Sequence, residues 1–116
     1  TYTGIVVDAS GLGLEATFSP VVYDTNGRAI YGMKNINKDY AISKGMVEYS
    51  TDVQAAAGGS TRAGANPLVV KATSVKGGGN SINPVNVVVS VEDGDKILLA
   101  NEKAPLLSEC AVVFVK

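Results

Sequence analysis

Side chains that carry acid–base, nucleophilic or metal chemistry are few in this chain of 116 residues. It contains no histidine, and histidine is the usual general base near neutral pH and the usual nitrogen ligand of zinc or copper. The carboxylates Asp8, Asp24 and Asp39 remain as candidates for a catalytic pair, which needs two carboxyl groups within several ångströms. Single carboxylates at strand ends and in turns more often accept backbone hydrogen bonds. We therefore expect structural roles for these aspartates, and no enzyme.

Cys110 is the single cysteine, so the chain forms no internal disulfide. It stands directly before the apolar run 111–115, where a buried thiol packs as a small apolar side chain. A reactive thiolate would need a neighbouring histidine or a basic cluster, and the sequence around it supplies neither. We expect a buried core thiol.

Two short motifs are fragments of ligand-binding loops. Residues 24–27 (Asp-Thr-Asn-Gly) contain part of a calcium-loop pattern, but its further acidic positions are absent. Residues 11–13 (Gly-Leu-Gly) follow a predicted strand as a dinucleotide fingerprint would, yet the third glycine is missing. Both are more typical of turns that need glycine's backbone freedom, so we expect no metal and no cofactor.

Composition excludes several classes of partner. Ten basic and eleven acidic side chains give a net charge of −1, and the basic ones are scattered, so no patch could neutralise a run of phosphates. The apolar runs are far shorter than the roughly 20 residues of a membrane-spanning helix. Only 18% of the residues are charged, against about 25% in ordinary domains. The sequence predicts one domain, residues 1–116, whose weakly charged surface favours coverage by neighbouring subunits.

The first third of the chain predicts three strands. Residues 3–9 contain the continuous apolar run 5–7, which is typical of a central strand buried on both faces. The dipeptide Asn26-Gly27 separates the apolar segments 21–23 and 29–31, which predicts a hairpin. A type I′ turn is expected there, with positive φ at both central residues.

The middle of the chain predicts a helix over residues 38–57. Asn37 is the expected N-cap, and Gly58 follows the last expected turn. Four apolar residues recur at intervals of four, three and four, which places them on one helix face: Ile42, Met46, Tyr49 and Val53. Gly45 inside this segment disfavours a helix by about 1 kcal/mol relative to alanine.

The second half predicts strands over 68–75, 86–89 and 110–115. A shorter helix is expected after Ser90, because Ser90 and Asp93 have the spacing of a capping box, and it must end before Pro105. The expected fold is α+β, with one mixed or antiparallel sheet of about five to six strands and two helices. The element order is β-ββ-α-β-β-α-β.

Two glycine-rich loops, 58–66 and 77–83, are expected to be exposed and available for contacts. Tyr23 and Tyr31 flank the hairpin turn, and amphipathic tyrosines are enriched in interfaces, although cross-strand packing explains them equally well. The candidate subunit contacts are Gly58, Gly59, Gly77, Gly78, Gly79, Tyr23 and Tyr31.

Several segments together resemble a domain of bacterial envelope proteins related to the flagellar outer-membrane lipoprotein FlgP. They are residues 4–14 (GIVVDASGLGL), 19–32 (SPVVYDTNGRAIYG), 39–49 (DYAISKGMVEY), 66–72 (NPLVVKA) and 90–97 (SVEDGDKI). The resemblance implies a non-enzymatic building block that is periplasmic, outer-membrane-associated or extracellular. It implies assembly into rings or disks with copies of itself and with other envelope proteins, and it carries over no catalytic residues.

Two functions follow as expectations. The first is a structural subunit of a ring, disk or filament, in which edge strands and the glycine-rich loops provide subunit contacts. The alternative is a monomeric binding module for a peptide or glycan, with Asp8, Leu12, Leu14 and the hairpin tyrosines around a pocket.

Overall fold

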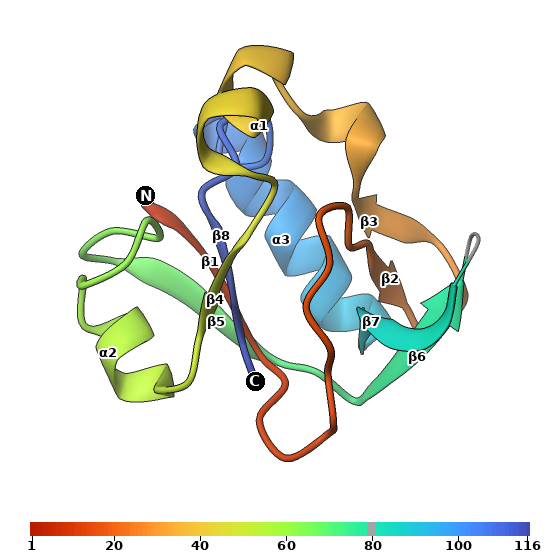
Figure 1. Ribbon diagram of the computed structural model, residues 1–116. Coiled ribbons are helices and arrows are strands. Elements are labelled where there is room, and N and C mark those ends of the chain that lie inside the picture. Colours follow the sequence, from red (N-terminus) through yellow and green to blue (C-terminus); the bar gives the residue numbers. More distant parts are fainter. Residues whose placement is uncertain (79–80) are drawn as a thin grey trace.

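The computed structural model describes residues 1–78 and 81–116, which form two four-stranded sheets and three α-helices (Figure 1). The strands are β1 (Gly4–Asp8), β2 (Val22–Asp24), β3 (Ala29–Tyr31), β4 (Glu48–Ser50), β5 (Pro67–Lys71), β6 (Ser74–Gly78), β7 (Ser81–Val89) and β8 (Val112–Val115). The helices are α1 (Lys38–Lys44), α2 (Val53–Ala57) and α3 (Val91–Lys103), and a 3₁₀ turn spans Met33–Asn35. None of the helices in the described part is long and apolar enough to cross a membrane.

The first sheet has the order β4-β8-β1-β5, and all its pairs are parallel. The central strand β1 is buried on both faces: Val6 packs with α2 on one face, and Val7 packs in the main core on the other. This confirms the prediction from the run 5–7, because a parallel strand covered on both faces reads as continuously apolar.

The second sheet has the order β3-β2-β7-β6, with β2 and β7 parallel and the other pairs antiparallel. Helix α3 lies between the two sheets and inserts Ile97 and Ala100 into the shared core (Figure 1). The arrangement is layered: α2, the parallel sheet, α3, and the mixed sheet. The α+β class is confirmed. The expected single sheet of about five to six strands, the two helices and the element order are wrong, because the chain passes between two sheets and the segments predicted as one helix and one strand each divide.

The predicted hairpin is present, but its turn differs from the prediction. The N–H of Gly27 donates to the carbonyl of Asp24 at 2.9 Å, and Gly27 has φ +84°. Asn26 does not have positive φ, since Cys110 is the only described non-glycine residue that does. The turn is therefore not type I′, and the ladder is irregular between Val22 and Tyr23. Asp24 explains the difference, because its carboxylate accepts from the N–H groups of Asn26 and Arg28.

The helix predicted over residues 38–57 is wrong as one element. Helix α1 ends at Lys44, because Gly45 has φ +77° and leaves the helical conformation at little steric cost. Residues 48–50 then form the edge strand β4, which pairs with β8, and the chain becomes helical again only in α2. Asn37 caps α1 as expected, since its side chain accepts the N–H of Asp39.

The strand predicted over residues 68–75 is two strands in two sheets, β5 and β6. The loop predicted over residues 77–83 is instead partly strand: β6 includes Gly77 and Gly78, and β7 begins at Ser81. Antiparallel pairing of β6 with β7 imposes this conformation on glycines that have weak strand preference by themselves.

The end of the chain follows the prediction more closely. The Ser90 hydroxyl accepts the N–H of Asp93 at 3.0 Å at the start of α3, which ends before Pro105. Strand β8 lies within the predicted range, and Cys110 is a buried free thiol, as expected.

Candidate functional site: an apolar surface groove

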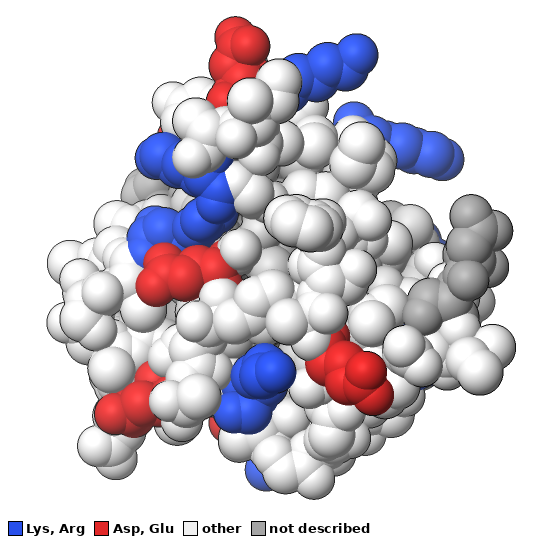
Figure 2. Space-filling view, in the orientation of Figure 1, with Lys and Arg blue, Asp and Glu red and all other residues white. Residues whose placement is uncertain are grey.

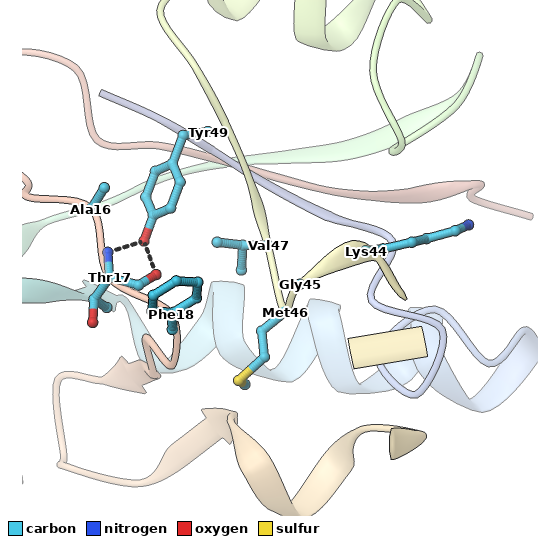
Figure 3. A pocket seen from close by; sticks show the side chains of 8 residues that line it. All are labelled: Ala16, Thr17, Phe18, Lys44, Gly45, Met46, Val47 and Tyr49. Atoms are coloured by element: carbon cyan, nitrogen blue, oxygen red, sulfur yellow. Dashed lines mark hydrogen bonds between the residues drawn. The ribbon is translucent and has the colours of Figure 1, made fainter. Parts of the chain in front are cut away.

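A surface groove of about 570 Å³ lies between the segment 16–18 and the turn that joins α1 to β4 (Figure 3). Its lining is mainly apolar, and Phe18 and Met46 stand at its middle (Figure 3). The lining residues are Ala16, Thr17, Phe18, Lys44, Gly45, Met46, Val47 and Tyr49. The volume falls within the range of about 300–1,000 Å³ that small-ligand pockets occupy.

One wall of the groove is fixed by Tyr49 on the edge strand β4. Its hydroxyl accepts the N–H of Thr17 at 3.0 Å and donates to the Thr17 carbonyl at 3.1 Å (Figure 3). Its ring packs edge-on against Phe114, with the centroids 6.0 Å apart. Burial raises the pKa of Tyr49, so the hydroxyl stays protonated at neutral pH and keeps both roles. The irregular segment before Pro20 is thus held at the edge of the sheet.

Arg62 fixes the opposite wall, where the turn at Gly45 leaves carbonyl groups without helical partners. Its guanidinium donates to the carbonyls of Lys44, Gly45 and Cys110, the last two at 2.9 and 3.2 Å. The backbone N–H of Arg62 donates to the Glu48 carboxylate at 2.8 Å. The turn that helix prediction missed is therefore a well-supported part of the groove.

A second hollow of about 430 Å³ adjoins the groove and shares Phe18, Gly45 and Met46 with it. Its further lining residues are Ser19, Met33, Ile36, Lys38, Ala41 and Ile42. We call the two hollows together, defined by these lining residues, the apolar face. Three of its large side chains are strongly exposed: Phe18 at 94%, Ile42 at 84% and Met33 at 66%.

Charged side chains stand around the rim of this face, while its centre is uncharged (Figure 2). Single exposed apolar side chains are ordinary, but several grouped within a charged rim are typical of an interaction site. The face is therefore suited to bind an apolar surface or segment.

The three aspartates that sequence analysis singled out lie on separate elements, and the carboxylates of Asp8 and Asp24 accept hydrogen bonds from their own chain. The Ser10 hydroxyl donates to Asp8 at 2.6 Å, and this bond lowers the pKa of Asp8. Asp24 is buried, which raises its pKa, but hydrogen bonds from Arg28 and Asn26 outweigh burial and lower it overall. Asp39 lies in the first turn of α1. Within the described residues, no three metal-ligating side chains group together.

The predicted contact residues lie outside the lining of the groove. Gly58 and Gly59 follow α2, and Gly77 and Gly78 lie on the edge strand β6. Gly79 falls outside the described residues. None of the described members of the set lines either hollow of the apolar face.

The two hairpin tyrosines differ in exposure. Tyr31 is buried at 1% exposure and donates its hydroxyl to the Met46 carbonyl at 2.7 Å, so its side chain offers no surface to a partner. Tyr23 is half-buried beneath the ammonium of Lys76, 4.1 Å from its ring centre. Of the residues suggested around a pocket with these tyrosines, Leu14 is buried in the core and Leu12 is exposed.

Sequence reasoning missed Phe18 and Met33 and placed Ile42 on a buried helix face. The available signal was Phe18 itself, an aromatic residue between polar neighbours and just before Pro20, outside every predicted strand. No comparable signal marked Met33, because its role depends on the 3₁₀ turn placing it beside Ile36.

The layered fold and the open groove define a small α+β domain with an exposed apolar face. Over residues 4–116 the chain matches the family described as Treponema pallidum Tp0624, second domain, and it belongs to this family. The family is a bacterial one, and the match contains no link to FlgP. No curated protein matches the chain.

Proposed function

We propose that this chain is a non-enzymatic structural subunit of a bacterial cell-envelope or extracellular assembly, built by self-association into a ring, disk or filament. The observation that carries the proposal is the apolar face, with Phe18, Ile42 and Met33 strongly exposed. Membership of a bacterial family and a charged fraction of only 18% also support it. Its place would be periplasmic, outer-membrane-associated or extracellular, with other envelope proteins as further partners.

Phe18, Ile42 and Met33 gain little free energy from burial in the isolated chain, because they stay exposed. Burying apolar surface stabilises the buried state by roughly 25 cal/mol per Å². The exposed side chains of the apolar face would gain this stabilisation only on association. Extended assembly also needs a second contact surface. The edge strands β3 and β6 of the mixed sheet are candidates, because edges carry unpaired backbone groups.

Mass in solution tests this proposal directly. Light scattering over a concentration series, followed by negative-stain microscopy of any large species, should show mass rising above 11.9 kDa and rings or fibres. A monomer of 11.9 kDa at every concentration would contradict self-assembly.

The groove also favours a second candidate, a monomeric module that binds a peptide or glycan. Its volume of about 570 Å³ and its apolar lining around Phe18 and Tyr49 suit a short apolar segment or the face of a sugar ring. NMR titration with a panel of apolar peptides and oligosaccharides tests it. Saturable shifts centred on Met46 and Val47 in a monomeric protein would favour this candidate over assembly.

A further inference from the structure

We propose that the apolar face binds a second copy of this chain about a two-fold axis, with Phe18 of each copy seated in the groove of the other. This inference rests on the proposed self-association and names its surface and its geometry. It is carried by three features: a protruding aromatic side chain, a hollow beside it, and a lysine at one end of that hollow with an exposed glutamate next in sequence to the residue at the other end.

The protruding side chain is Phe18, whose exposure is 94%. It does not hang on a free loop, because both backbone polar groups of Thr17 are bonded to the Tyr49 hydroxyl at 3.0 and 3.1 Å. A side chain presented from an anchored backbone loses less conformational freedom on binding than one on a loose segment. Aromatic residues of this kind are enriched among those that contribute most to interfaces.

The hollow beside Phe18 is large enough for the same side chain from another copy. A dry cavity of about 150 Å³ holds a benzene ring, and the groove has about 570 Å³. Gly45 leaves it open, and Met46 and Val47 supply an apolar lining. The protruding ring and the hollow share one face. When two copies meet face to face, the ring of each can therefore enter the hollow of the other, and this reciprocal contact is the property of a two-fold interface.

Two charged residues, Lys44 and Glu15, fit the same geometry. Ala16 lies at one end and Lys44 at the other, with Phe18 and Met46 between them (Figure 3). The exposed residue Glu15 directly precedes Ala16. A two-fold axis through the middle of the groove brings Lys44 of one copy towards Glu15 of the other. Such pairs contribute mainly to the orientation of a complex and to its rate of formation.

Sedimentation velocity over a concentration series tests the surface. Removing both buried rings with Phe18→Ser should raise the dissociation constant of the pair at least about tenfold. Ile82→Ser is the matched control, because Ile82 is equally exposed, at 98%, and lies outside the groove. That variant should associate as the wild type does. Thermal unfolding by circular dichroism checks that both variants are folded.

Charge reversal tests the two-fold geometry. Lys44→Glu and Glu15→Lys should each weaken the pair, and the double variant should regain the wild-type dissociation constant within about twofold. A double variant no better than the single ones would overturn this geometry. If Phe18→Ser leaves the dissociation constant unchanged, the apolar face is not the contact surface, although self-association stands. If the wild type never associates, the proposed function is contradicted as well.

Discussion

Two apolar regions of this domain have similar side chains and opposite exposure. Inside, Val6, Val7 and Phe114 are each at 0% exposure on the faces of the parallel sheet. On the apolar face, Phe18 and Ile42 are at 94% and 84%. The interior residues stabilise the folded monomer, and the exposed ones leave their apolar area to a partner. Apolar content alone therefore does not distinguish residues that stabilise the monomer from residues that would serve association, whereas position in the fold does.

Tyr49 connects the core and the apolar face. Tyr49 packs its ring on Phe114 in the core and holds Thr17 at the groove with its hydroxyl. The exposed face is thus built from the edge of the same sheet whose centre is the core. Substitutions should therefore divide into those that affect stability and those that affect association, with Tyr49 at the boundary.

The largest effect is expected from Phe114→Ala in the core. Truncating a fully buried phenylalanine leaves a cavity and should lower the free energy of unfolding by about 3–5 kcal/mol. Urea denaturation followed by circular dichroism measures it. Ile42→Ala is the matched control on the apolar face and should change the free energy by less than about 0.5 kcal/mol. Equal losses in the two variants would break the distinction between the regions.

A smaller loss is expected from Tyr31→Phe, which removes one hydroxyl and leaves the ring. The Tyr31 hydroxyl donates to the Met46 carbonyl at 2.7 Å in the buried interior, and burial raises the pKa of Tyr31. An acceptor left without its donor in the core should cost about 1–3 kcal/mol. The same denaturation measurement applies. Tyr40→Phe, which changes a half-buried tyrosine on α1, is the control. An equal change in both variants would argue against a role for the buried bond.

A still smaller loss of stability is expected when acid protonates Asp24 in the hairpin turn. The pKa of Asp24 is lowered in the folded state, because hydrogen bonds from Arg28 and Asn26 outweigh its burial. Its contribution is therefore present above the unfolded pKa of about 3.9 and is lost as the pH falls through the lower folded value. In the Asp24→Asn variant, the part of the acid-induced loss of stability that comes from Asp24 should disappear. A wild type and variant with parallel stability curves from pH 6 to 2 would contradict the prediction.

The parts of the fold that the sequence predicted are those fixed by local chemistry or by complete burial. The run 5–7 is apolar because β1 is covered on both faces, and the start of α3 is set by the Ser90 cap. Asn26-Gly27 marked the hairpin, although the Asp24 carboxylate, rather than the pair alone, set the turn type.

The parts that could not be predicted depend on distant partners. Residues 48–50 form a strand only because β8 pairs with them, and three residues are too few to show a strand pattern. The interval from Ile42 to Met46 matched a helix by coincidence, since Gly45 turns the chain between them and leaves one exposed and the other buried. The apolar face was missed for the same reason, because it joins residues 16–19 to residues within 33–49, and only the tertiary fold brings these two stretches together.

The smallest effect on stability, and the most informative, is expected from Phe18→Ser. Because the Phe18 side chain is almost fully exposed in the monomer, its removal at low concentration should change the free energy of unfolding by less than about 0.5 kcal/mol. At concentrations where the wild type associates, its melting temperature should rise with concentration, since association stabilises the folded state by mass action. The variant should lose that rise and keep the same dilute melting temperature. Loss of stability in the dilute variant would mean that Phe18 supports its own chain, and the apolar face would then belong to the core rather than to an interface.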